Sequence, residues 1–241
     1  MLNALAIDPP QVLDCQVHQL RPVATVSPVR SYGKGPLERA TFRRFQSKEN
    51  VFCEGEPSKN VYQIEDGVVT IYQMLSDGRR QIVDFAYPGD FIGLGTTRQY
   101  LFSAEATTAT RVRCYNASIL EDAARSDPNL AVQLYKAVSL ELSAARALLV
   151  AIGQRSAIER VATFLLMLHQ RMPKDNSDDR LLHLPMRRAD IGDFLGLTIE
   201  TVSRTITKLR RMRVIEVTPG NGIRITNFER LAEFSQRQPY N

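Results

Sequence analysis

The stretch Arg188-Ala-Asp-Ile-Gly-Asp-Phe-Leu-Gly-Leu-Thr-Ile-Glu-Thr-Val-Ser-Arg204 decides the fold of the C-terminal part of the chain. A short helix over 188–195 is expected to stop at Gly196, because glycine readily adopts the left-handed conformation that ends helices. Thr198 is the expected N-cap of a second helix that runs to about Met212. Two helices joined by a tight glycine turn form a helix-turn-helix.

Basic charge is concentrated in the same part of the chain. The 241 residues carry 31 lysines and arginines against 26 aspartates and glutamates, a net charge of +5. Residues 1–155 are nearly neutral, with 17 basic and 16 acidic side chains, whereas residues 156–241 carry 14 and 10. The segment 187–213 alone holds seven basic and three acidic residues. This local excess favours a nucleic-acid partner.

The second helix is expected to have two unlike faces. Its buried face follows from the apolar spacing of Val202, Ile206 and Leu209. Glu200, Ser203 and Arg204 project together from the first two turns, which usually meet base edges when a helix enters the major groove. The alternative is a solvated amphipathic helix with a glutamate–arginine pair across one turn. The glycine turn and the local charge favour DNA.

We expect the polar side chains of this region to divide the contacts to DNA. Arg204 can donate two hydrogen bonds to guanine, and Glu200 can accept one from cytosine. Ser203 or Ile199 can touch a thymine. Phosphate contacts are expected from side chains on and around the second helix: Thr198, Thr201, Lys208, Arg187, Arg188, Arg210, Arg211 and Arg213.

The rest of the chain predicts an α+β protein. Short β-rich runs with Asp-Gly and Pro-Gly turns fill 40–115 and indicate a small antiparallel barrel or sandwich. Helices are expected over 116–124 and 156–171, and a polar loop over 173–179. Apolar runs at 214–218 and 223–226 flank Pro-Gly-Asn-Gly and predict a hairpin, the wing beside a helix-turn-helix. Residues 1–35, rich in proline and glycine, are interpreted as an irregular arm.

A long helix is expected from 129 to about 153, since this segment has no proline and no glycine before Gly153. Apolar residues recur along it with alternating spacings of 3 and 4, at Tyr135, Val138, Leu142, Ala145, Leu149 and Ile152. Such a stripe predicts a partner helix from a second copy, and the alternative is packing on the chain's own β domain. A second apolar flank allows both contacts, with Leu130, Leu134, Leu140 and Leu148.

Other functional classes find little support. No uninterrupted apolar run approaches the ~18–20 residues of a membrane span, and the N-terminus lacks a signal pattern, so we expect a cytoplasmic protein without a membrane partner. The cysteines are too few and too far apart for a disulfide framework or a metal site: Cys15, Cys53 and Cys114. We expect no enzyme, because the histidines lack partners at catalytic spacing: His18, His169 and His183.

The segment 190–204 resembles the helix-turn-helix signature of the cyclic-AMP receptor protein superfamily, and within it the FNR and FixK branch. The resemblance continues through Gly89-Asp-Phe-Ile-Gly93, the long helix and the wing, and covers about residues 40–235. Glu200, Ser203 and Arg204 match the E-x-x-S-R residues with which that branch reads half-sites similar to TTGAT and its complement ATCAA.

This resemblance implies four parts of the chain: an arm over 1–35, a cyclic-nucleotide-binding-like β-roll over 36–127, a dimerisation helix over 128–155 and a winged helix-turn-helix domain over 156–241. It also implies a homodimer on a palindromic TTGAT-N4-ATCAA-like site. The protein would activate transcription in a microoxic or anaerobic response by touching RNA polymerase. One polymerase surface would be an exposed turn at Asp77, Gly78, Arg79 and Arg80.

Departures from the family pattern bear on the effector. Cyclic-AMP receptors hold the cyclic phosphate with an Arg-Ser pair, but Phe102 takes the arginine place here and removes the cation. Oxygen-sensing relatives hold an iron–sulfur cluster with several N-terminal cysteines and an internal one that Cys114 resembles, yet the arm contains only Cys15. We therefore expect no cofactor. The alternative is a regulator that takes an unidentified small effector in the β-roll.

A further departure concerns dimerisation. By the same resemblance, oxygen-sensing relatives have an aspartate at the position of Ala145. Two like charges would then meet in their dimer, and association would wait for the cluster. Burying facing carboxylates without partners is costly. The alanine in this chain predicts a dimer that forms without DNA or cofactor.

Overall fold

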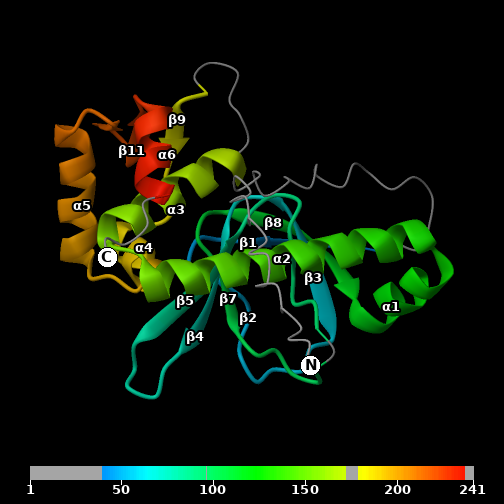
Figure 1. Ribbon diagram of the computed structural model, residues 1–241. Coiled ribbons are helices and arrows are strands. Elements are labelled where there is room, and N and C mark those ends of the chain that lie inside the picture. Colours follow the sequence, from blue (N-terminus) through cyan, green and yellow to red (C-terminus); the bar gives the residue numbers. More distant parts are fainter. Residues whose placement is uncertain (1–39, 96, 172–178, 237–241) are drawn as a thin grey trace, which may run out of the picture.

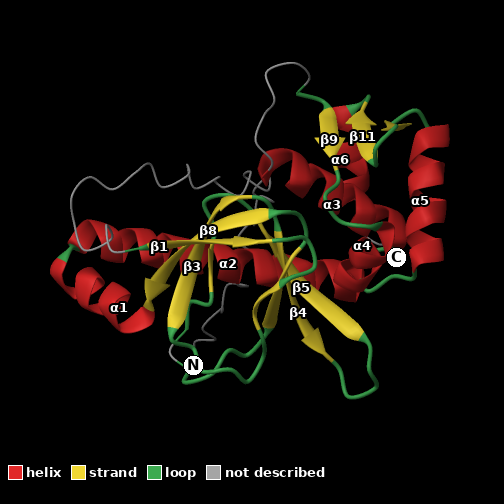
Figure 2. Cartoon of the chain, turned by 180° about the vertical axis from the view of Figure 1, so that it is seen from behind, coloured by secondary structure: helices red, strands yellow, loops and turns green. Residues whose placement is uncertain are grey.

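The computed structural model of the chain describes residues 40–95, 97–171 and 179–236 (Figure 1). The expected arm over 1–35, with Cys15 and His18, and most of the expected loop over 173–179 lie outside these residues. The described chain forms a domain of strands, a long helix, and a C-terminal domain of helices with a small sheet (Figure 2). This arrangement confirms the predicted α+β fold class.

The described part of the N-terminal domain contains two four-stranded antiparallel sheets, with strand orders β1-β8-β3-β6 and β2-β7-β4-β5. Buried side chains from both sheets, among them Ile64, Val69 and Val112, share one core. This double-sheet roll matches the predicted barrel or sandwich. The strands are β1 (Thr41–Phe45), β2 (Asn50–Phe52), β3 (Asn60–Asp66), β4 (Val69–Met74), β5 (Arg80–Ala86), β6 (Phe91–Ile92), β7 (Ser103–Ala106) and β8 (Thr110–Asn116).

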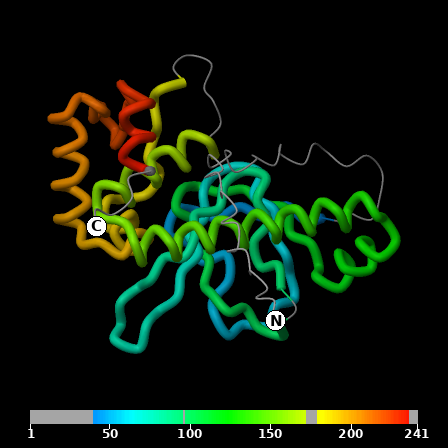
Figure 3. Tube along the Cα trace, viewed as in Figure 1, coloured from blue at the N-terminus to red at the C-terminus, as the bar shows by residue number. Residues whose placement is uncertain are grey.

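Two helices follow the last strand of the roll. Helix α1 (Ala117–Ser126) is capped by the side chain of Asn116, which accepts hydrogen bonds from two backbone N–H groups of the first turn. Helix α2 (Pro128–Gln154) begins at a proline, which suits the first helical position, and Asp127 is its N-cap. Figure 3 shows α2 running along the β-roll to the C-terminal domain. The long helix predicted from the sequence is confirmed.

The C-terminal domain combines four helices and three strands in the described residues. The sheet is antiparallel in the order β10-β11-β9, and the hairpin β10–β11 is the predicted wing. The third strand and the last helix were not predicted. The elements are α3 (Ala157–Arg171), β9 (Leu181–His183), α4 (Arg188–Leu195), α5 (Ile199–Arg211), β10 (Ile215–Thr218), β11 (Gly222–Ile225) and α6 (Phe228–Gln236).

Strand β5 joins the two domains. Phe85 of β5 packs against Phe164 of α3 and Phe194 of α4, with ring centroids 6.3 Å and 5.3 Å away. The ring centroids of Phe164 and Phe194 are 5.7 Å apart. These rings belong to one core of buried side chains that runs from the roll into the C-terminal domain. Helix α4 of the helix-turn-helix therefore packs against the β-roll as well as against its own domain.

Polar groups reinforce this contact at both ends of β5. Arg80 pairs with Asp190 of α4 at 2.5 Å, and Gln81 donates to the backbone carbonyl of Asp193 at 2.6 Å. At the other end, Arg171 of α3 pairs with Asp84 at 3.4 Å. The same guanidinium pairs with Asp90 and lies 4.9 Å from the ring centre of Tyr87.

Candidate nucleic-acid interface

The turn of the helix-turn-helix depends on two glycines. Gly196 follows α4 with a φ of 62°, the left-handed conformation predicted for it. Gly192 lies one turn earlier, and its carbonyl accepts a hydrogen bond from the N–H of Leu197 at 3.0 Å. A Cβ on Gly192 would lie 2.6 Å from the carbonyl oxygen of Leu197, so a side chain there would push the turn open. The role of Gly196 was predicted from the sequence, whereas that of Gly192 was not, because it depends on the close approach of Leu197 in the folded turn.

Helix α5 starts at the predicted cap. The hydroxyl oxygen of Thr198 accepts a hydrogen bond from the N–H of Thr201 at 3.2 Å. The predicted inner face is buried in the domain core, at Val202, Ile206 and Leu209. The helix is therefore held from one side, and its other side is free to meet a partner.

The outer face of α5 carries the side chains expected to read bases. Glu200 and Arg204 are exposed, Ser203 is half-buried, and Ile199 is exposed at the start of the helix. Hydrogen bonds from its own backbone N–H and from Thr198, with the charge of Arg204, hold the pKa of Glu200 below its usual value. Glu200 is thus a carboxylate at neutral pH and can accept a hydrogen bond but not donate one.

The expected phosphate-binding groups surround this face. Lys208 is exposed on α5, and Arg188 reaches across from α4 to donate to the hydroxyl of Ser203 at 3.4 Å. Arg187 donates to the carboxylate of Asp190 at 3.2 Å, although most of its side chain is exposed. The remaining groups lie at the start of α5, in its last turn and just after it: Thr198, Thr201, Arg210, Arg211 and Arg213. The sequence analysis missed the bond between Arg188 and Ser203, since its partners are 15 residues apart.

The predicted apolar stripe of α2 lies largely in the open. Tyr135 and Leu149 are 73% and 71% exposed, and Val138, Leu142 and Ala145 are exposed between them. Ile152 is half-buried near the turn of the helix-turn-helix. The other flank packs inward as expected, with Leu134 against the roll and Leu148 against the core shared by the domains. In the single chain, the stripe is thus free to contact a partner.

Helix α2 is long and apolar enough to cross a membrane when length and composition alone are considered. The length of uninterrupted apolar runs does not predict this, because polar and charged residues divide the apolar residues of the helix. The helix carries Lys136, Glu141 and Arg146, and one flank packs on the protein. A helix with this pattern is better suited to pair with another protein helix than to lie in lipid.

Aromatic side chains pack closely in the described interior of the β-roll. The rings of Phe52 and Tyr100 stack with centroids 3.9 Å apart, and Tyr100 donates to the backbone carbonyl of Asn60 at 2.7 Å. Phe102, which the sequence resemblance assigns to the place of the family's arginine, is partly exposed. Ser103 already accepts a hydrogen bond from the backbone N–H of Glu54 at 3.0 Å. None of these four side chains carries the positive charge that would pair with an anionic ligand.

The described cysteines do not resemble a cluster site. Cys114 is buried in the core of the roll, as expected of a small apolar side chain, and Cys53 is half-buried. Over residues 40–95, 97–171 and 179–236, no three histidines, cysteines or acidic residues gather as metal ligands.

The exposed turn between β4 and β5 differs from the expectation at one residue. The side chain of Arg79 is 77% exposed and pairs with Asp77 at 2.7 Å, and Gly78 completes the turn. Arg80 instead lies in the domain contact, where it pairs with Asp190 and Glu105. The guanidinium of Arg80 is therefore not part of the open turn, because Glu105 of β7 and Asp190 of α4 hold it.

Both domains match families of known proteins. Residues 42–127 match the family model of the cyclic nucleotide-binding domain, and residues 159–234 match that of the Crp-like helix-turn-helix domain. The nitrogen fixation regulation protein FixK of Bradyrhizobium diazoefficiens is 42% identical over 176 residues, which cover 73% of this chain and 74% of that relative. The transcriptional activatory protein AadR of Rhodopseudomonas palustris is 37% identical over 202 residues, or 81% and 84% of the two chains.

Solved structures support the same arrangement. The structure of FixK2 from Bradyrhizobium japonicum superposes with a TM-score of 0.77 at 38% identity, and the match covers 83% of this chain and 99% of that one. A CRP-family transcriptional regulator from Thermus thermophilus has a TM-score of 0.68 at 22% identity, over 81% and 97% of the chains, which shows a shared fold.

Proposed function

Because the chain belongs to the CRP/FNR family of transcription regulators, in its FixK branch, we propose that it acts as a homodimeric activator on a palindromic TTGAT-N4-ATCAA-like site. Its family consists of regulators rather than enzymes, and the helix-turn-helix domain implies DNA binding. We further propose that residues 36–127, 128–155 and 156–241 serve as sensor-like, dimerising and DNA-binding parts. A transcription regulator acts on the chromosome, so we place it in the cytoplasm.

The observation that carries this proposal is the outer face of α5. Glu200 and Arg204 leave the helix on the side opposite its buried face, and Ser203 lies between them. An arginine that donates to guanine and a carboxylate that accepts from cytosine form a recognition pair for G·C base pairs. Each half-site TTGAT contains one such pair. Lys208 and Arg188 flank this face and suit phosphates.

The second part of the proposal is that two copies associate through α2. The exposed stripe from Tyr135 to Ile152 has the spacing of a two-stranded coiled coil. Parallel pairing relates the two chains by a two-fold axis, so their recognition helices face equivalent half-sites on one face of the duplex. This symmetry is the reason for proposing a palindrome.

We propose that neither cyclic nucleotide nor an iron–sulfur cluster is needed. The aromatic packing of Phe52 and Tyr100 and the position of Phe102 support independence from an anionic nucleotide. For contact with RNA polymerase we propose the turn of Asp77, Gly78 and Arg79, which projects from the roll. Arg80 is left out because α4 engages it.

A titration of the purified protein tests the proposal. Fluorescence anisotropy compares the TTGAT-N4-ATCAA duplex with a scrambled duplex of equal length, in air, under argon, and with cyclic AMP. We expect strong preference for the palindrome and equal affinity in all three conditions. Equal binding to both duplexes would contradict the proposed site, and a large gain on adding nucleotide would contradict effector independence.

A further inference from the structure

The end of α2 and the turn between α4 and α5 meet at one side chain, that of Arg160 in α3. Its Nε donates to the carbonyl of Arg155 at 2.9 Å, and its Nη2 donates to the carbonyl of Ile152 at 2.6 Å. Its Nη1 donates to the carbonyls of Leu195 at 3.0 Å and Gly196 at 3.4 Å. One guanidinium therefore binds the C-terminal carbonyls of both α2 and α4.

The chemistry of helix ends explains why an arginine suits this place. Carbonyls in the last turn of a helix lack partners within it and form the negative end of its dipole. Arg160 supplies positive charge to two such ends at once. Its planar guanidinium directs several N–H donors along fixed directions, whereas a lysine ammonium is a compact charge without that geometry. The bonds of Arg160 thus constrain both distance and direction between the two helices.

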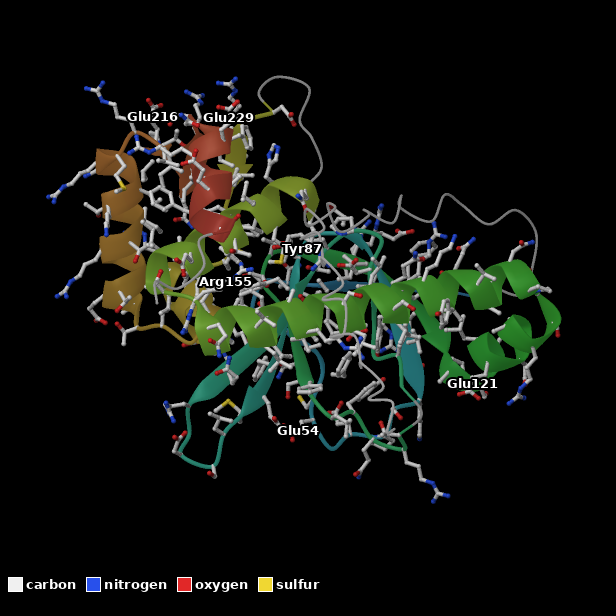
Figure 4. All side chains as sticks on the ribbon, viewed as in Figure 1. Glu54, Tyr87, Glu121, Arg155, Glu216 and Glu229 are labelled. Carbon is white, nitrogen blue, oxygen red and sulfur yellow. The ribbon has the colours of Figure 1, made fainter. Side chains whose placement is uncertain are left out.

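The backbone near Arg160 is closely packed around the same point. A Cβ added to Gly196 would lie 3.6 Å from Nη1 of Arg160 and 3.7 Å from Cγ2 of Ile152. The glycine turn therefore sits against the end of α2, with the guanidinium beside it. Arg155, labelled at this junction in Figure 4, makes a different contact, since its Nη1 donates to the hydroxyl of Thr163 within α3.

We propose that Arg160 is a positioning residue that fixes the direction of α5 relative to α2, and so sets the separation of the two recognition helices in the dimer. This inference rests on the proposed function, because the separation matters only when a dimer binds two half-sites. Helix α5 follows the turn directly, so a shift of Gly196 moves its start. The two-fold axis repeats any such shift in the partner, and the half-sites require recognition helices ~34 Å apart.

The test uses the full chain with Arg160→Lys, and with Arg155→Lys as the matched control at the neighbouring arginine. Anisotropy titrations compare TTGAT and ATCAA half-sites separated by three, four, five or six base pairs, together with a duplex mutated inside the half-sites. Sedimentation and circular dichroism report dimerisation and folding. Arg160→Gln, which keeps two amide N–H donors but no charge, is measured in parallel.

We expect wild type and Arg155→Lys to prefer the four-base-pair spacer strongly. Arg160→Lys should remain a folded dimer that still rejects mutated half-sites. Its preference for the four-base-pair spacer over the six-base-pair spacer should fall about tenfold, which corresponds to about 1.4 kcal/mol. A merely destabilised protein would lose affinity for all spacers in equal proportion, so the ratio of affinities isolates positioning.

Two outcomes overturn the inference while the proposed function stands. The first is an Arg160→Lys dimer with the wild-type spacer preference. The second is loss of the folded dimer in both Arg160 variants, which would show that this side chain supports the fold rather than the direction of α5. Wild-type protein that does not prefer the palindrome would instead overturn the proposed function and remove the basis of the inference with it.

Discussion

Helices α2 and α5 each keep one face exposed, and the two exposed faces differ in chemistry. Helix α2 exposes apolar side chains such as Tyr135 and Leu149. Helix α5 exposes Glu200, Arg204 and Lys208 and buries its apolar residues after Ile199. A polar face is already solvated in water, but an apolar stripe gains free energy only when another surface covers it. We therefore expect different partners for the two helices: a permanent protein partner for α2, and DNA as a conditional partner for α5.

This difference gives an order of assembly. The stripe on α2 should be covered before DNA is present, because its driving force does not depend on DNA. Helix α5 is fully anchored in the single domain through Val202 and Leu209, so it needs no DNA to fold. We expect preformed dimers that present two structured recognition helices.

The largest effect on dimerisation and DNA binding is expected from Ala145→Asp. This change puts a charged side chain into the apolar stripe of α2. Two carboxylates would then face each other in the dimer, and a buried charge that is left uncompensated costs about 3–5 kcal/mol. The variant should sediment as a monomer at micromolar concentration and lose operator affinity. Wild-type protein should sediment as a dimer without DNA.

The matched control for this change is Ala147→Asp. Ala147 is exposed on the same helix, two residues further along and outside the apolar stripe. This variant should remain a dimer with near-normal DNA binding. Equal behaviour of the two aspartate variants would show that the stripe is not the interface.

Local signals explain why the helix-turn-helix could be predicted so closely from the sequence. The bounds of α4 and the left-handed Gly196 agree with prediction because both depend on neighbouring residues. Strand β9 was missed because three residues give little local signal and the strand exists through its pairing with β11. Helix α6 had a usable signal, since Asn227 accepts a hydrogen bond from the N–H of Arg230 at its start.

The next largest effect is expected on the polar face of α5, from Arg204→Ala. Loss of a bidentate contact to guanine should cost about 1–3 kcal/mol at the cognate site and flatten the preference at that base pair. Competition titrations with duplexes altered at one position measure both quantities. The variant should remain dimeric, because α2 is unchanged.

Arg210→Ala is the control on the same helix. Arg210 is exposed in the last turn of α5, away from the first two turns that meet base edges. Its loss should leave the base preference intact. If Arg204→Ala also keeps full sequence preference, the assignment of the reading face is wrong.

A smaller and less selective effect is expected from Lys208→Ala. A lysine on a phosphate releases counterions without reading sequence, so its loss should weaken cognate and scrambled duplexes alike. The slope of log K against log salt should become shallower by about 0.9 for each phosphate that the variant no longer neutralises. A change in base preference would instead place Lys208 on the base edges.

Long-range contacts explain what the sequence could not show about the site. The spacing of residues 200, 203 and 204 is enough to put their side chains on one face of a helix. The pairing of Arg80 with Asp190 joins residues 110 positions apart, and no local pattern marks it. The same holds for Arg160, whose carbonyl partners belong to two different helices. Sequence patterns thus indicate which side chains share the outer face of α5 better than which ones hold this helix in place.

The smallest effect on dimerisation and on base reading is expected from Asp84→Asn. Asp84 lies in the contact between β5 and α3, away from the exposed faces of α2 and α5. Burial is the largest influence on this carboxyl and raises its pKa from 3.8 to about 6, although Arg171 opposes the shift. Asp90 adds a like charge, and Tyr87 and Glu141 lie in the same electrostatic environment. The asparagine variant therefore separates domain stability from dimerisation and base reading.

The sign of the pH effect follows from the raised pKa. The folded chain holds the proton of Asp84 more tightly than the unfolded chain, so this carboxyl contributes its full stabilisation below about pH 4. That contribution is lost as the pH rises through about 6. Asparagine has no proton to lose, so the thermal midpoint of Asp84→Asn should fall less than that of wild type between these pH values. Equal slopes in circular dichroism melts would show that Arg171 keeps Asp84 ionised throughout, and an altered base preference would show that the contact between β5 and α3 controls α5.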